Sequence, residues 1–469
     1  MLDQLRADAL GCYGNPTVET PNIDALATRG TVFTSAYTPS PVCVPARACL
    51  ISGQEPQRLG CFDNGSPMPA TPTLMSLLTD AGYRTHGVGK MHFTPDTADL
   101  RGFQTRDSEE EFGDCESDDY LRWLSAAGHD AVQFPHGMRD EMYYIPQLSP
   151  LPEEAHPTRW VAERSRDFLA ERRSPFFLWS SFIAPHPPFS PPAPWHRRYP
   201  ASLLPEPHRP AGGGSLLTSY NRLQNRYKFR DGGRDRRLEQ LIRSYYYASI
   251  TFADHEIGRI VAALADSGRL DDTMIILTAD HGEFLGDYGC YGKRSFLDPA
   301  ARVPLICSGP GFGRGQRIGS PVSLVDILPT AIRAAGAELP DTDGLPLQTP
   351  AADRTLYGQY QQGTLGLYSV INQRWKYIWS APDHREYLID RRHDPLETMN
   401  LAYNIRAREQ LLALRRQATA HFQELDLERV AADSHNHPVR IGAAPSEGGG
   451  DAFAGLDIDP DAATLIVQD

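Results

Sequence analysis

Short runs of apolar residues that end in turn residues mark the expected strands of this chain. Residues 175–183 and 273–278 are the strongest of these runs, and the second leads into Asp280-His281-Gly282. Residues 83–88 and 303–307 are weaker candidates. Runs of this length that contain aromatic and β-branched residues and are bounded by Gly, Pro or Asp are typical of buried strands.

Helical spacing of apolar residues fills the stretches between those strands. It predicts helices over residues 73–81, 156–173 and 237–266, the first of them capped by Thr71 with Pro72 in its first turn. Strands that alternate with helices indicate an α/β fold, a mixed and mostly parallel sheet covered by helices on both faces. Ligands bind such sheets at the carboxyl ends of the strands, which is where His186 and Asp280-His281 lie.

The pattern of apolar and polar residues changes near Asp343-Gly344. Strand-like stretches within 368–379 and 386–390 and a helix over 405–425 predict a smaller α+β unit. We therefore expect a main α/β domain over residues 1–345, a C-terminal α+β subdomain over 346–430 and an irregular tail over 431–469. Residues 184–214 are rich in Pro and Gly, which predicts a long surface loop.

Charge and cysteine content limit which binding partners, disulfides and zinc sites are expected. The chain has 469 residues and a formal net charge of -13, so neither nucleic acid nor an anionic membrane surface is an expected partner. Its seven cysteines include no C-x-x-C pair, which predicts neither a disulfide framework nor a structural zinc site. The chain shows no apolar run of about 18 residues and no signal peptide, so we expect a cytoplasmic protein. Its oligomeric state is left open.

Two pairs of residues could bind a metal ion. Asp280 and His281 follow a strand and offer a carboxylate and an imidazole, although a surface turn would also explain them. Asp3 and Gln4 form a second pair of oxygen donors. Taken alone, that second pair indicates almost nothing.

Cations and histidines gather in the same part of the predicted sheet. Lys90 and His92 lie two apart in a segment expected to be extended, so they would face the same side. Both can donate to anionic oxygens, and His92 can also transfer protons. Two solvent-exposed loop residues would give the same sequence pattern. His186, among prolines, and Lys293, shortly after Asp280-His281, would add to this group. Together these residues indicate a metal and cations around a tetrahedral oxyanion.

The stretch SPVCVPARACLISG (residues 40–53) carries the most specific signal. Its Cys43-Val44-Pro45-Ala46-Arg47 closely resembles the C-x-P-[SA]-R signature of the type I sulfatases, members of the alkaline phosphatase superfamily. Further blocks resemble that family in order and extend the resemblance to about residue 425: Asp3-Gln4, Thr20-Pro21-Asn22-Ile23-Asp24, Gly89-Lys90-Met91-His92, Pro185-His186-Pro187-Pro188, Asp280-His281-Gly282, Gly292-Lys293, Arg302-Val303-Pro304-Leu305, Asp394-Pro395 and Asn400-Leu401.

The resemblance implies a sulfuric ester hydrolase that acts on a small-molecule or saccharide sulfate ester. A maturation enzyme would convert Cys43 to Cα-formylglycine, whose hydrate supplies the nucleophilic hydroxyl. A divalent metal, Ca²⁺ before Mg²⁺ or Mn²⁺, would be held by the residues Asp3, Gln4, Asp280 and His281.

It also implies roles for the remaining site residues. Arg47, Lys90 and Lys293 would stabilise charge in the transition state. His186 or Lys293 would assist the departing alcohol, and His92 would take the proton of the second hydroxyl.

The sequence departs from the family pattern at its start. The family usually has a strand before the first metal-binding aspartate, whereas here that aspartate is Asp3. We therefore expect Asp3 on a fraying end of a shortened chain, and Gln4 as a weaker ligand than the aspartate often found there. Two other functions stay open: a phosphonate monoester or phosphodiester hydrolase of the same superfamily, and an inactive binding protein if Cys43 is unmodified.

Overall fold

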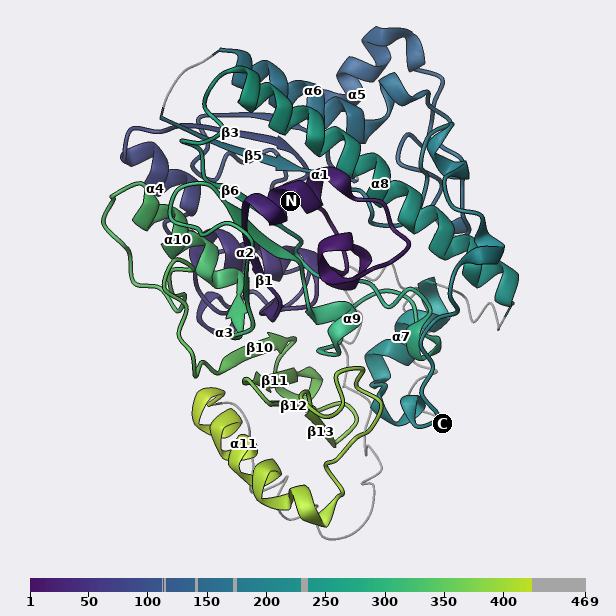
Figure 1. Ribbon diagram of the computed structural model, residues 1–469, viewed down its shortest axis with the longest axis vertical. Helices are drawn as coiled ribbons and strands as arrows, with labels where there is room; N and C mark the ends of the chain where they lie inside the picture. Colours follow the sequence, from purple (N-terminus) through teal and green to yellow (C-terminus); the bar gives the residue numbers. More distant parts are fainter. Residues whose placement is uncertain (112, 114, 140–141, 172–174, 229–234, 424–469) are drawn as a thin grey trace.

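The computed structural model describes residues 1–111, 113, 115–139, 142–171, 175–228 and 235–423 (Figure 1). Helices and strands alternate along most of this length. The helices are α1 (Pro21–Arg29), α2 (Cys43–Ser52), α3 (Pro56–Leu59), α4 (Leu74–Asp80), α5 (Asp119–Leu124), α6 (Pro157–Ala170), α7 (Ser219–Lys228), α8 (Arg236–Asp266), α9 (Asp298–Ala301), α10 (Ile327–Ala334) and α11 (Arg408–His421). The strands are β1 (Gly30–Phe33), β2 (Ala36–Tyr37), β3 (Arg84–Gly89), β4 (Thr105–Ser108), β5 (Phe176–Ser181), β6 (Ile275–Thr278), β7 (Leu305–Ser308), β8 (Gln316–Ile318), β9 (Val322–Ser323), β10 (Leu356–Tyr360), β11 (Leu367–Ile371), β12 (Trp375–Ser380) and β13 (Arg385–Asp390).

The main domain contains two sheets and a short strand pair. One sheet has the order β4-β3-β5 and is parallel throughout. The other has the order β6-β7-β1-β8, in which β7 is antiparallel to both neighbours and β8 is parallel to β1. The short strands β2 and β9 pair in parallel. The sheets are therefore mixed, as the sequence predicted.

Helices lie on either side of these strands (Figure 1). α6 packs on α8 and contacts β3 and β5, while α4 contacts β3 and packs with α2 and α10. This confirms the predicted α/β class with helices on both faces. No helix in the described ranges has the length and apolar character needed to cross a membrane.

The first three residues join the two sheets. Leu2 forms parallel bridges to both Phe182 and Ala279. Its N–H donates to Thr278 O at 3.0 Å, and the N–H of Asp3 donates to Phe182 O at 3.0 Å. Asp3 is completely buried. The expectation that Asp3 would fray is therefore wrong, because the backbone around it is hydrogen-bonded to both sheets.

The cap of α4 differs from the prediction. Thr73, not Thr71, precedes the helix, and its hydroxyl accepts from Ser76 N at 3.1 Å while Ser76 Oγ accepts from Thr73 N at 2.9 Å. This reciprocal pair is a capping box, which satisfies two backbone donors at the start of a helix. The helix predicted over 156–173 is α6, and His156 caps it by accepting from Thr158 N at 3.2 Å.

A four-stranded antiparallel sheet, β10-β11-β12-β13, follows the main domain. α11 covers one of its faces, and the other face packs against the main domain near Phe296 and Leu297. Both faces are therefore buried, and every residue of β11 and β12 is buried, which fits the apolar and aromatic residues by which the sequence predicted them. β10 was not predicted. The boundary at residue 345 stays a prediction, and the predicted tail over 431–469 lies outside the described residues.

Candidate active site

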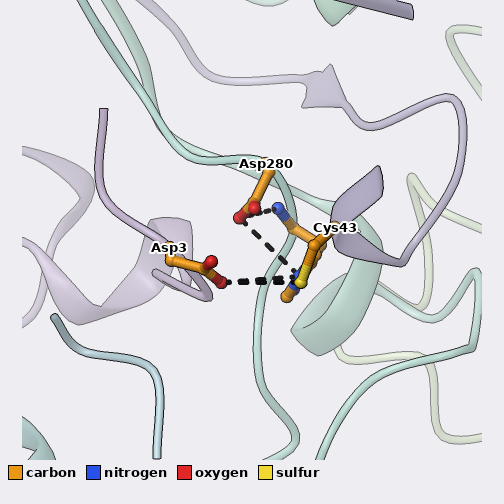
Figure 2. A group of neighbouring side chains, drawn as sticks. Asp3, Cys43 and Asp280 are labelled. Carbon is orange, nitrogen blue, oxygen red and sulfur yellow. Dashed lines mark hydrogen bonds and ion pairs between the residues drawn. The ribbon is translucent and has the colours of Figure 1, made fainter. Parts of the chain in front are cut away.

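Cys43 is the first residue of α2, and its side chain is buried in a polar cluster. Lys293 Nζ lies 2.8 Å from Cys43 Sγ, and His281 Nε2 lies 3.2 Å from it. Figure 2 shows Asp3 and Asp280 near Cys43, and Asp3 Oδ1 lies 3.9 Å from the sulfur. The start of α2 therefore meets residues from the chain start and from the segment after β6.

Four of these side chains could hold a metal ion together. Ligand atoms of Asp3, Cys43, Asp280 and His281 all lie within 4.8 Å of one another, and all four side chains are buried. Asp3 follows the Leu2 bridge, and Asp280 and His281 follow β6 by one residue. The buried carboxylates and imidazole thus meet at the carboxyl end of β6, where strand-end ligand sites are expected.

Gln4 completes the set of oxygen donors. Its backbone N–H donates to Asp280 Oδ1 at 3.1 Å, and its side-chain amide nitrogen donates to the Glu283 carboxylate. Its Oε1 is buried and has no hydrogen-bond partner among the described residues. A buried oxygen without a donor is costly unless something occupies its lone pairs. The residues present therefore fit a divalent cation that prefers oxygen ligands.

Arg47 lies one helical turn after Cys43 and is completely buried. Its Nη2 donates to Asp3 Oδ2 at 3.1 Å and its Nε to Asp280 Oδ2 at 3.0 Å. Its Nη1 donates to the backbone oxygen of Lys90 at 2.6 Å. The guanidinium therefore joins the two candidate metal-binding carboxylates and the end of β3. Its predicted contact with a sulfate ester stays a prediction.

Lys90 and His186 reach the same cluster from neighbouring strands. Lys90 directly follows β3; its Nζ lies 2.5 Å from Asp3 Oδ2 and also pairs with Glu111. His186 lies in the turn after β5, and its Nε2 is 3.4 Å from Lys293 Nζ. The structure thus brings together Lys90, His186, Lys293 and Cys43, as the strand-end argument required.

His92 is placed differently from the sequence argument. The chain is not extended there, because Gly89 and His92 both have positive φ, +86° and +54°. The alternation that would align Lys90 with His92 therefore does not apply. Within the described ranges, no hydrogen bond or ion pair links His92 to Cys43, and its buried Nδ1 has no hydrogen-bond partner. Its backbone N–H donates to Glu110.

Charge around Cys43 favours an anion at this position. Burial alone would raise the pKa of the Cys43 thiol, but Lys293, Lys90 and His281 outweigh burial and hold that pKa well below its usual value. A cluster that stabilises a negative sulfur also stabilises other anionic groups at the same place. The surroundings of Cys43 thus favour negative charge, although the chain as a whole carries a negative net charge.

Two buried glutamates were missed by the sequence analysis. Glu283 accepts from Gln4, from Tyr144 Oη at 2.9 Å and from the N–H of Gly292 at 2.5 Å. Glu111 pairs with Lys90 and lies 3.3 Å from His186 Nδ1. Glu283 lies two residues after His281, so its closeness to the predicted metal ligands could have identified it as a site residue. Glu111 ends a run of three glutamates, a pattern that ordinarily indicates a solvated surface.

Comparison with known proteins agrees with this geometry. The family model described as Sulfatase matches residues 1–337. An arylsulfatase of Clostridium perfringens is 30% identical over 452 residues, which cover 89% of this chain and 92% of that protein. A choline-sulfatase of Rhizobium meliloti is 30% identical over 456 residues, covering 90% and 86% respectively. The structure of a phosphonate monoester hydrolase of Agrobacterium radiobacter superposes with a TM-score of 0.79 at 26% identity, covering 91% of this chain and 95% of that one. The chain therefore belongs to the sulfatase family and is a sulfuric ester hydrolase.

Proposed function

We propose that the chain hydrolyses sulfate monoesters at Cys43, after a maturation enzyme has converted this residue to Cα-formylglycine. The contact that carries the proposal is Lys293 Nζ at 2.8 Å from Cys43 Sγ, with the candidate metal ligands Asp3, Asp280 and His281 close to the same sulfur. A hydrated aldehyde at this position supplies the nucleophilic hydroxyl. The cations around it suit an ester that carries one negative charge and gains more on its leaving oxygen.

The metal site is proposed to consist of Asp3, Gln4, Asp280 and His281, and to bind Ca²⁺. Oxygen donors dominate the set, which favours Ca²⁺ or Mg²⁺ over zinc. The bound ion would lower the pKa of the nucleophilic hydroxyl. Arg47 would hold both carboxylates in place through its contacts of 3.0 and 3.1 Å.

Metal binding can be tested separately from activity. Chelator-treated protein should unfold at a lower temperature, and Ca²⁺ should restore the midpoint in a concentration-dependent way, because a ligand of the folded state alone stabilises it. Gln4→Ala should weaken this Ca²⁺ response. Stoichiometric zinc in active protein would contradict the assignment.

The other residues bind and polarise the ester in this proposal. Lys90 and Lys293 would donate to sulfate oxygens, and His186 or Lys293 would give a proton to the departing alcohol. His92 would accept the proton of the second hydroxyl, which requires its side chain to turn toward position 43. Arg47 would contribute through the carboxylates that it holds.

The alcohol part of the substrate is proposed to be an aryl group or a saccharide. Two observations support sulfate esters of this kind. The arylsulfatase of Clostridium perfringens is similar over nearly its whole length, and one structural neighbour was solved with D-glucosamine-2-N,6-O-disulfate as its substrate. A panel of aryl and saccharide sulfates, assayed by sulfate release, would separate the two.

A phosphonate monoester hydrolase is the second candidate. Gln4 beside Asp3 favours it, since the opening Asp-Gln pair can occur in that group, and so does the structural neighbour from Agrobacterium radiobacter. The kcat/KM for 4-nitrophenyl sulfate should exceed that for a 4-nitrophenyl phosphonate monoester. The reverse order would make the second candidate the main activity.

A further inference from the structure

Glu111 connects several cationic residues of the site. Its side chain is only 5% exposed and follows β4 in a short acidic segment. Its carboxylate pairs with Lys90 Nζ, lies 3.1 Å from Arg139 Nη2 and lies 3.3 Å from His186 Nδ1. A buried carboxylate needs such partners, because an unpaired charge would be expensive inside the protein. Its position is therefore fixed by the cationic side chains of Lys90 and Arg139, with His186 beside it.

The ring of His186 has one nitrogen on the Glu111 side and one on the Cys43 side. Nδ1 lies 2.7 Å from Pro187 O, and a carbonyl oxygen can only accept a hydrogen bond, so Nδ1 carries a proton. Nε2 is 3.4 Å from Lys293 Nζ, which in turn contacts Cys43. Nε2 is therefore the nitrogen that can exchange a proton with a bound ester.

We propose that Glu111 is a positioning residue that holds His186 for proton donation to the departing alcohol. The carboxylate lies 3.3 Å from Nδ1, whose hydrogen bond goes to Pro187 O, and its charge stabilises the protonated ring. In the step concerned, the bond between sulfur and the alcohol oxygen breaks and its electron pair stays on that oxygen, which takes the proton from Nε2. Sulfur bonds instead to the oxygen nucleophile at position 43. This inference rests on the proposed hydrolysis of sulfate esters.

Glu111 offsets part of the cost of protonating the buried His186 ring. Burial lowers the pKa of His186 to about 3; Glu111 and Asp3 act to raise it, and Lys293 and Lys90 act to lower it further. Glu111 is the largest of the raising influences. Without its charge, the imidazole would be still harder to protonate and a poorer acid at neutral pH.

A purely structural role for Glu111 gives a different kinetic result. If Glu111 served only to hold Lys90, which would contact sulfate oxygens, its removal would slow the hydrolysis of all esters equally. Proton donation matters most for esters whose alcohol is a poor leaving group. The dependence of rate on the leaving group therefore distinguishes the two roles.

The test compares Glu111→Gln with wild type on phenyl sulfate and 4-nitrophenyl sulfate, using protein whose Cys43 conversion has been measured by mass. We expect kcat/KM to fall about 100-fold or more on phenyl sulfate and less than about 10-fold on the nitrophenyl ester. Glu109→Gln is the matched control. Glu109 is also buried and lies two residues from Glu111, but among the described residues no hydrogen bond or ion pair links its carboxylate to His186 or Lys90. Glu109→Gln should leave the ratio of the two rates unchanged.

Each outcome decides one point. Equal losses on the two esters in Glu111→Gln would overturn the role of Glu111 while leaving sulfate hydrolysis intact. Wild-type protein that releases sulfate from neither ester would contradict the proposed function itself. If Glu111→Gln does not fold, Glu111→Asp keeps the charge but moves it away from Nδ1. Glu111→Asp should also lower kcat/KM more on phenyl sulfate than on 4-nitrophenyl sulfate, by a smaller factor than Glu111→Gln. An equal loss of kcat/KM on the two esters would count against the proposal.

Discussion

The Lys293 ammonium lies 2.8 Å from the Cys43 sulfur, although the two residues are 250 positions apart in the chain. Cys43 begins the buried helix α2, and Lys293 lies in the segment between β6 and α9. The contact exists because the end of β6 and the start of α2 meet at one edge of the sheets. It places an amino group beside the side chain that would be converted to the nucleophile.

Lys293→Ala should therefore lower kcat by about 100- to 1,000-fold, the loss typical of one donor to a developing negative charge. KM should change much less, because the interaction strengthens in the transition state. Steady-state sulfate release from an aryl sulfate measures both quantities. Arg294→Lys is the control, since Arg294 is next in sequence but donates to Gln224 Oε1 and Tyr360 Oη instead. A Lys293→Ala variant that changes only KM would contradict the assigned role.

Arg47→Met should destabilise the protein even before any catalysis is considered. The substitution keeps a side chain of similar length but leaves the buried carboxylates of Asp3 and Asp280 without their shared cation. Breaking a buried ion pair in this way costs about 3–5 kcal/mol of unfolding free energy. Urea unfolding of the unmodified protein measures this cost, and added Ca²⁺ should recover part of it.

A surface pair supplies the comparison for Arg47. Arg29 and Asp271 are 2.7 Å apart, and the Asp271 side chain is 80% exposed. Arg29→Met should cost only about 0–1 kcal/mol, since solvent screens exposed pairs. If the Arg47 and Arg29 variants unfolded at the same urea concentration, the buried network would not have the structural importance assigned to it.

Acid should destabilise the fold partly through His156. Burial lowers the pKa of His156 to about 4, from about 6.5 in the unfolded chain. Between these values the unfolded state binds more protons, so stability is present above about pH 6.5 and is lost as the pH falls. His156→Asn keeps an oxygen that can cap α6 and removes the titrating group. Its unfolding free energy should fall less steeply than that of wild type from about pH 7 to about pH 5. Parallel curves for the two proteins would show that His156 does not contribute.

Much of the site could be predicted because motif residues follow strands. Lys90 follows β3, His186 follows β5 and Asp280 follows β6, and the carboxyl ends of strands in such folds gather ligand-binding side chains. α2 was harder to predict. All ten of its residues are buried, so the helix has no polar face and leaves no helical period in the sequence.

Other features depend on pairing that no local pattern reveals. Asp3 is held by backbone hydrogen bonds from Leu2 to the last residue of β6 and from Asp3 to the residue after β5. Glu111 becomes a buried partner of Lys90 and His186 only through tertiary packing. Nothing in its acidic neighbourhood distinguishes it from a surface residue. The left-handed backbone at His92 likewise could not be anticipated, because non-glycine residues adopt it rarely.

The chemistry assigned to Cys43 is central to the proposed hydrolysis. The most direct test co-expresses the chain with a formylglycine-generating enzyme and measures sulfate release per mole of protein against the fraction of Cys43 converted, as determined by mass spectrometry of the peptide. We predict that turnover rises in proportion to conversion and is absent in Cys43→Ala, whose fold should persist because the new side chain is smaller and apolar. Turnover that is independent of conversion, or retained in Cys43→Ala, would contradict the account.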